Sequence, residues 1–270
     1  MSRPVPVALT VAGSDSGGGA GIEMDLKVFG ALGVYGTCAI TALTAQNSRE
    51  VRSTWEVPAG EVAAQMAAVL DDLPVAAVKT GMLSSDAIVR AVAGVVKERR
   101  LSPLVVDPVM AAKDGSRLLS EAGVAALRDV LIPLASLVTP NAAEAEVLTG
   151  VAVGCEEEAW GAAEKLRALG CKWVLVKGGH LRGGEARDFL LGPDGAQVLS
   201  SPRIPGGPFH GTGCALSAAI TAYLARGEPF PQAANLSRAF LQELLRTAQR
   251  LGAGSLLLHP SSNAPKEQQS

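Results

Sequence analysis

The chain has 270 residues, of which 48% are hydrophobic, and it carries 24 basic against 26 acidic side chains. The hydrophobic share excludes a mostly disordered chain, and the length suits one large domain better than two. Because charge is balanced and no block of Lys and Arg occurs, a nucleic-acid partner is excluded. No run of about 18 apolar residues could span a membrane, and no secretory leader is recognisable, so we expect a cytoplasmic protein without a membrane partner.

Cysteine and histidine are too few and too scattered for a metal centre built on them. Cys38, Cys155, Cys171 and Cys214 form no CxxC pair, and the chain has only three histidines. Zinc sites and redox motifs need closely spaced thiols or imidazoles. The chemistry must therefore rely on carboxylates, lysine, a single thiol or backbone amides.

Short Val-rich apolar runs alternate along the chain with longer Ala-rich segments of helical period. The predicted strands are 5–12, 37–45, 75–79, 104–107, 134–139 and 173–177, and the predicted helices are 21–32, 60–70, 86–99, 120–131, 142–148, 156–169, 212–226 and 231–251. Strict alternation predicts an α/β protein with a mainly parallel central sheet, covered by helices on both faces in three layers. We expect one domain over residues 1–260 and a polar, disordered tail over 261–270.

In open parallel sheets, ligands bind beyond the carboxyl ends of the strands, where helix N-termini present free amides. The first strand runs into the glycine-rich segment 13–21. Its glycines would let the backbone approach a ligand and aim its N–H groups there, although a plain tight turn explains them too. Ile22 breaks the G-x-G-x-x-G dinucleotide pattern, and no Gly-Lys dipeptide exists to form a Walker A loop.

Polar residues follow the later strands, and each has a simple structural explanation beside a functional one. The Gln46 amide could hydrogen-bond a planar heterocycle, since it has both a donor and an acceptor, or Gln46 could merely end a strand. Asp107 could position a metal or a phosphate. Asn141 and Glu144 have the spacing of a capping box, which explains both without a ligand. Lys177 is well placed for a polyphosphate, although one lysine is often only solvated surface.

The most informative segment is HGTGCALSAAI, residues 210–220. Gly211, Thr212 and Gly213 open a helix of small apolar residues, and its first-turn amides form an anion hole for a transferring group. Cys214 lies in the same turn, where a helix N-terminus is expected to lower the pKa of a thiol. A buried structural cysteine is the alternative.

Together these segments resemble the ribokinase-like superfamily and, within it, the hydroxymethylpyrimidine/phosphomethylpyrimidine kinase family of thiamine biosynthesis. The matching stretches follow the family's order from about residue 11 to about residue 220: VAGSDSGGGAGIEMDLK, ITALTAQNS, VKTGML, VVDPVM, TPNAAEAEVLTG, VLVKGGHL and HGTGCALSAAI. Three residues depart from the family pattern. Glu23 and Met24 stand where Gln and Ala are usual, and Ala215 replaces a common Thr, which removes a hydroxyl beside the anion hole.

The resemblance implies ATP-dependent phosphorylation of 4-amino-5-hydroxymethyl-2-methylpyrimidine to its monophosphate and then to its diphosphate, with Mg²⁺, in a homodimer. It implies that Cys214 is catalytic, where the sugar kinases of the superfamily carry an aspartate, and that Gln46 hydrogen-bonds the aminopyrimidine. The remaining residues that it assigns are Gly13, Asp25, Met82 and Val109 near the substrate, Lys177 near the nucleotide, and Asp107, Asn141 and Glu144 in the Mg²⁺–phosphate region.

The two expected transfers differ chemically, because an alcohol must lose a proton whereas a monophosphate oxygen is already anionic. We therefore expect Cys214 to act as a base, or as a polar aid to deprotonation, mainly in the first transfer. Three alternatives remain: a pyridoxal or pyridoxine kinase, a thiol hydrolase using Cys214 with the nearby His210, and a non-catalytic binding protein for a vitamin precursor. The Lys113-Asp114-Gly115 region is a candidate flap over the site.

Overall fold

The structure is a computed structural model that describes residues 4–112, 115–179, 181 and 183–260. The predicted tail over 261–270, and Lys113 and Asp114 of the predicted flap, lie outside the described residues. Within the described part of the chain, no helix is both long and apolar enough to cross a membrane.

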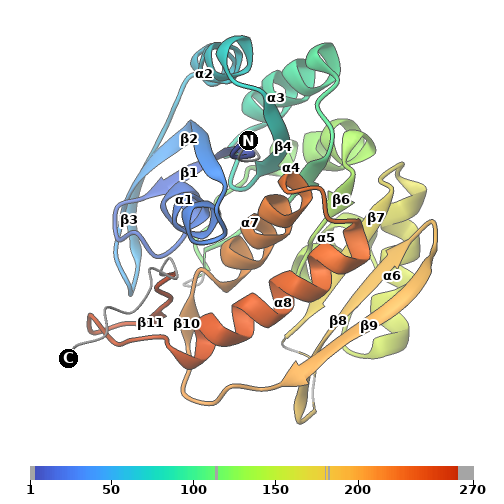
Figure 1. The fold of residues 1–270 in the computed structure, drawn as a ribbon. Coiled ribbons are helices and arrows are strands. Elements are labelled where there is room, and N and C mark those ends of the chain that lie inside the picture. Colours follow the sequence, from blue (N-terminus) through green and yellow to red (C-terminus); the bar gives the residue numbers. More distant parts are fainter. Residues whose placement is uncertain (1–3, 113–114, 180, 182, 261–270) are drawn as a thin grey trace.

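A nine-stranded sheet runs through the molecule in the order β3-β2-β1-β4-β5-β6-β7-β8-β9 (Figure 1). Its strands are β1 (Val7–Asp15), β2 (Tyr35–Gln46), β3 (Val51–Glu56), β4 (Val75–Thr80), β5 (Leu104–Val106), β6 (Leu137–Val138), β7 (Trp173–Gly178), β8 (Glu185–Gly192) and β9 (Gly195–Pro202). In sheet order, the six strands β2, β1, β4, β5, β6 and β7 are parallel. At one edge β3 pairs antiparallel with β2, and at the other β8 pairs antiparallel with both β7 and β9. The prediction of a mainly parallel α/β sheet is confirmed.

Helices cover both faces of this sheet (Figure 1). One face carries α1 (Gly21–Ala31), α7 (Thr212–Ala225) and α8 (Phe230–Arg246), and the other carries α2 (Ala59–Asp72), α3 (Asp86–Arg99), α4 (Glu121–Ala126), α5 (Ala142–Thr149) and α6 (Glu156–Ala168). Two hydrophobic layers result, one on each side of the strands. The three-layer α/β/α arrangement is therefore as predicted.

The local sequence explains why α7 packs so closely on the sheet. Ala215, Ala218, Ala219 and Ala222 are fully buried and repeat at the spacing of one helix face. Their small side chains let the helix backbone approach β1 and β4, which it contacts. The N-terminus of α7 is thereby held at the carboxyl edge of the sheet.

The predicted strict alternation of strand and helix is wrong after β7. There the chain forms an antiparallel hairpin, in which β8 and β9 are joined by a turn at Gly192-Pro193-Asp194-Gly195. Antiparallel neighbours need only a tight turn, and the Pro-Asp-Gly sequence supplies one. The short β10 (Phe209–His210) and β11 (Leu256–Leu257) form a separate pair, and α8 ends at Arg246 rather than at residue 251.

The strand order reverses at β1, which pairs with β2 on one side and β4 on the other. Helices that follow strands on the two sides of such a point lie on opposite faces, and this leaves a crevice beyond the strand ends. The topology therefore positions a binding site at the carboxyl ends of β1 and β4.

Candidate active site

A cavity of about 740 Å³ lies at this switch point. All the site residues expected from the sequence line it except Asp25: Gly13, Gln46, Met82, Asp107, Val109, Asn141, Glu144, Lys177, Gly211, Thr212, Gly213 and Cys214. Residues more than 200 positions apart in the chain are thus brought to one cavity wall.

The start of α7 supplies amides to the cavity. The first N–H bonded within this helix belongs to Ala215, which donates to the carbonyl of Gly211 at 2.9 Å. Among the described residues, no side chain caps the helix, so the amides of Thr212, Gly213 and Cys214 are available to an anion. Gly211 has φ 77°, and a Cβ at this position would overlap the backbone of Gly19. A glycine is therefore required at this cap.

An ion pair faces this helix start. Lys177 Nζ lies 2.8 Å from Asp107 Oδ1, and Ser217 on α7 donates to Asp107 Oδ2 at 3.0 Å. Burial alone would raise the pKa of Asp107, but Lys177 and Lys79 lower it overall, so the carboxyl stays ionised. A Cβ added to Gly213 would lie 3.3 Å from Lys177 Nζ. The ammonium and the helix amides therefore converge on one small volume.

Asn141 and Glu144 form the capping box of α5 and line the cavity at the same time. The Glu144 N–H donates to Asn141 Oδ1 at 2.9 Å, and the Asn141 N–H donates to Glu144 Oε2 at 2.7 Å. Burial raises the pKa of Glu144 to about 7, against the opposing effect of Lys177, whose Nζ lies 4.0 Å away. The structural and the functional explanations of this motif are thus compatible.

The carboxylates fit a magnesium ion that arrives with phosphate oxygens. Mg²⁺ is usually held by one or two carboxylates together with substrate phosphates and water, rather than by a cage of side chains. The described residues contain no cluster of three or more His, Cys, Asp and Glu side chains that could hold a metal alone. Here Lys177 is the cation beside two carboxylates, which leaves Glu144 only partly compensated. Glu144 is therefore the carboxylate best placed to take part in such a site.

Behind the cavity wall lies an ion pair that the sequence reasoning missed. Lys79 is fully buried and lies 2.7 Å from both carboxylate oxygens of Asp25, which also accepts from Thr10 Oγ1 at 2.6 Å. Burial by itself would lower the pKa of Lys79, but Asp25 raises it overall. Asp25 therefore meets the cavity only through Lys79. A lysine inside an otherwise apolar strand was the available signal, because buried lysines are nearly always paired.

The expectation of a lowered pKa at Cys214 is wrong. Burial raises the pKa of this half-buried thiol to about 11, because desolvation outweighs the favourable charge of Lys79. The nearby carboxylates Asp25 and Asp107 add to the increase. The position at a helix N-terminus did not predict the pKa of this thiol, because desolvation has the larger effect.

The glycine-rich segment also differs from its expected role. The amides of Gly17, Gly19 and Ala20 donate to the Asp15 carboxylate at 2.8, 3.0 and 2.9 Å. Glu23 accepts from the Asp15 N–H at 2.7 Å, so the family departure at this position caps the end of β1. These N–H groups hold the loop itself and are not aimed at a ligand.

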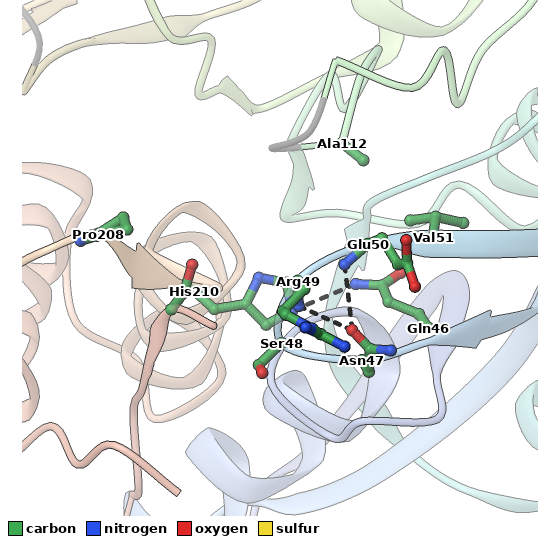
Figure 2. Close-up of a pocket in the computed structure, with 10 residues that line it drawn as sticks. Gln46, Asn47, Ser48, Arg49, Glu50, Val51, Ala112, Pro208 and His210 are labelled. Carbon is green, nitrogen blue, oxygen red and sulfur yellow. Dashed lines mark hydrogen bonds between the residues drawn. The ribbon is translucent and has the colours of Figure 1, made fainter. Parts of the chain in front are cut away.

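Gln46 lines both the main cavity and a smaller one of about 330 Å³. Figure 2 shows the smaller cavity with Gln46 and His210 in its wall. Its amide contacts Thr44 Oγ1 at 3.3 Å and His210 Nε2 at 3.2 Å. The small cavity is lined largely by residues 46–51, with Pro208 and His210 opposite. A flat ligand bound in the main cavity would meet the Gln46 amide at this end.

Two solved structures with the same architecture are kinases. The pyridoxal kinase of Bacillus subtilis, determined as an ADP complex, is 36% identical, with a TM-score of 0.88 over 95% of this chain and 98% of that one. The phosphomethylpyrimidine kinase of Clostridium difficile 630 is 42% identical, with a TM-score of 0.79 over 88% and 98%. The fold and the placement of the cavity define the class as that of the ribokinase-like kinases of small molecules.

Within that class the chain belongs to the hydroxymethylpyrimidine/phosphomethylpyrimidine kinase family. The family model described as phosphomethylpyrimidine kinase matches residues 15–259. The hydroxymethylpyrimidine/phosphomethylpyrimidine kinase of Rhizobium meliloti is 50% identical over 92% of this chain and 93% of its own length. A bifunctional thiamine-biosynthesis protein of Geobacter sulfurreducens, ThiED, is 48% identical, and the chain spans about half of that protein.

Proposed function

We propose that the protein transfers the γ-phosphoryl group of ATP to 4-amino-5-hydroxymethyl-2-methylpyrimidine, and then transfers a second one to the resulting monophosphate. The observation that carries this proposal is the convergence of Lys177 with the open amides of Thr212, Gly213 and Cys214 in the cavity that Gln46 also lines. Phosphoryl transfer needs mainly positioning and neutralisation of charge, and these groups supply both.

In the first transfer, the bond from the γ-phosphorus to the β,γ-bridging oxygen of ATP breaks and a bond forms to the hydroxymethyl oxygen. The hydroxyl proton goes to the Cys214 thiolate. The helix amides and Lys177 stabilise the negative charge on the moving group. Glu144 and Asp107 would hold a Mg²⁺ ion, which would supply further neutralisation of the phosphate charge. In the second transfer the attacking phosphate oxygen is already anionic, so it needs no base.

The raised pKa of Cys214 gives this scheme a pH signature. With a pKa of about 11, the thiolate fraction increases about tenfold per pH unit across the neutral range. The ratio of kcat/KM for the alcohol to kcat/KM for the monophosphate should therefore rise with pH above about 7. Taking the ratio cancels the titration of Glu144, which acts on both transfers. A ratio that does not change with pH would contradict the role of base.

The direct test is ADP release with each acceptor in separate assays, using Cys214→Ser. We expect kcat/KM to fall by about 100-fold or more with the alcohol, because general base catalysis is lost, and by much less with the monophosphate. Cys155→Ser is the matched control, because Cys155 is exposed and does not line the cavity. Equal losses on both acceptors would contradict the division of labour, and no ADP release by the wild type would contradict the function.

Pyridoxine belongs in the same assay as a competing alcohol. The likeness to the Bacillus subtilis pyridoxal kinase favours that activity as a second candidate. The relatives named as hydroxymethylpyrimidine/phosphomethylpyrimidine kinases cover the chain at higher identity, which favours the pyrimidine. A higher kcat/KM for pyridoxine than for the pyrimidine would reverse this order.

We also propose that the protein is a cytoplasmic homodimer that uses Mg²⁺. The support is the resemblance to the family and, for the dimer, an exposed apolar pair at the edge of the sheet. Leu43 on β2 lies opposite Trp55 on β3, and they are 46% and 60% exposed. Two large apolar side chains that face each other on the surface are typical of an association patch.

A further inference from the structure

The orientation of the Gln46 amide can be deduced from its neighbours. An amide oxygen and an amide nitrogen have the same shape, so their positions are assigned from the hydrogen bonds that they make. Each end of the amide has one partner: the structure places Gln46 Nε2 3.2 Å from His210 Nε2, and Gln46 Oε1 3.3 Å from Thr44 Oγ1. The contact to His210 is drawn in Figure 2.

His210 Nε2 must carry a proton. It lies 2.9 Å from Asp15 Oδ2, on a carboxylate that already accepts from three backbone N–H groups. Burial by itself would raise the pKa of Asp15, but the bond to His210 and these amides lower it overall, so the carboxyl is an anion. An anionic acceptor at this distance requires Nε2 to be the donor. The group of Gln46 that faces Nε2 must then be its oxygen, because an amide N–H would meet a second donor, and this oxygen shares the single Nε2 proton with Asp15.

The other side of Gln46 leads to the same assignment. Thr44 Oγ1 gives its single proton to the carbonyl oxygen of Ser14 at 2.8 Å. The Thr44 hydroxyl can therefore only accept from Gln46, which places the amide nitrogen on this side. Two independent partners thus assign the same orientation, with Oε1 toward His210 and Nε2 toward Thr44, which is the reverse of the one drawn in Figure 2.

We propose that His210, held by Asp15, is a positioning residue that determines specificity by fixing which way the Gln46 amide faces. This inference rests on the proposed function. In the fixed orientation, Gln46 keeps one oxygen lone pair and one N–H for a ligand. That pattern complements a heterocycle that carries an amino group beside a ring nitrogen. Without the His210 proton, Thr44 alone opposes turning of the amide, and a turned amide would present its N–H to the amino group of the ligand.

The surroundings of His210 suit a rigid support. The ring is 14% exposed and comes from β10, directly before the helix start that receives phosphate in the proposed function. A Cβ on Gly19 would overlap the ring, so the glycine-rich loop is packed directly against it. His210 thereby connects three parts of the site: the loop after β1, the end of the cavity at Gln46 and the start of α7.

The test measures binding of the aminopyrimidine alcohol and of its analogue without the 4-amino group, by calorimetry. His210→Leu removes the donor, and His210→Gln keeps an N–H near the position of Nε2. We expect the Leu variant to bind the aminopyrimidine about fivefold more weakly, as the loss of one neutral hydrogen bond would cause, with little change for the analogue. The Gln variant should recover most of the difference. Thr44→Val removes the second partner and should also weaken binding of the aminopyrimidine selectively.

Folding of each variant is checked by its unfolding temperature and by binding of a non-hydrolysable ATP analogue, which neither His210 nor Thr44 is expected to contact. Equal weakening for both pyrimidines in the Leu and Val variants would show that His210 has only a structural role. The same would follow if both variants kept the full wild-type preference for the amino group. If the wild type shows no preference for the amino group, the assignment of the substrate fails instead. The two failures are therefore distinguishable.

Discussion

A fully buried ammonium is rare in proteins, and here Lys79 has Asp25 as its counterion with both oxygens at 2.7 Å. Lys79 lines the cavity and Asp25 lies behind it, and their charges act on the pKa of the Cys214 thiol in opposite directions. Such a pair favours a rigid cavity wall, because movement of either partner would leave the other as an uncompensated charge in a medium of low polarity. Asp25, which resemblance suggested as a substrate contact, does not line the cavity and instead pairs with Lys79, which does.

Replacing Lys79 by Met should destabilise the protein strongly. The change leaves the Asp25 carboxylate buried with Thr10 as its remaining partner, and breaking such a pair costs about 3–5 kcal/mol of unfolding free energy. Urea unfolding measures this loss. The double variant Asp25→Asn/Lys79→Met removes both charges and should recover part of it. A loss below about 1 kcal/mol in the single variant would show that Asp25 takes up a proton or water at little cost.

At the scale of single elements, α5 and α7 use their N-termini in opposite ways. The start of α5 is closed by the reciprocal bonds of Asn141 and Glu144, whereas the start of α7 has Gly211 and no side-chain cap within the described residues. A closed helix start is stable without a ligand, and an open one leaves its amides to an anion. The difference explains why a phosphoryl group is expected at α7, with Glu144 beside it.

The capping carboxyl of α5 should make stability depend on pH. The folded pKa of Glu144 is about 7, above the ordinary value of 4.5. The folded state therefore holds this proton more tightly than the unfolded state, and stability is lost as pH rises from about 4.5 through 7. Relative to Glu144→Gln, which has no proton to lose, the wild type should lose on the order of 3 kcal/mol between about pH 4.5 and 8.

Urea unfolding of both proteins at several pH values measures this difference, because other titrating groups affect the two proteins alike. Parallel stability curves would contradict the raised pKa. A difference that grows in the wild type's favour with increasing pH would reverse its direction.

At the scale of the whole molecule, the sheet edge at β3 is the surface that we expect a second copy to cover. Every residue of β3 after Val51 is exposed, and Trp55 is 60% exposed. An open edge strand with large apolar residues is prone to association unless it is covered.

Trp55→Glu should therefore halve the mass measured by sedimentation equilibrium, because a charge at the patch opposes its burial. Leu251→Glu is the matched control, since Leu251 is 70% exposed and lies outside β2 and β3. A Trp55→Glu protein that remains dimeric would place the interface elsewhere, and a monomeric wild type would remove the dimer from the proposed function.

The sequence alone determined the layered α/β architecture, and all but one of the site residues predicted from it line the cavity. It could do so because apolar periodicity marks buried strands and helices, and because polar residues that end parallel strands meet at one edge. Its errors were local. The β8–β9 hairpin does not follow the expected alternation, although the Pro-Asp-Gly sequence could have predicted its turn. Strand β3 was not predicted, because it has almost no buried face.

Tertiary structure alone decided the electrostatics of the cavity. The pairing of Lys79 with Asp25 and the pKa of about 11 at the Cys214 thiol depend on distances between segments far apart in the chain. Charge interactions and desolvation vary steeply with separation and with access of water, and residue order specifies neither. Residue types in the sequence indicated where the site lies, and the packing around those residues determined their pKa values and ion pairs.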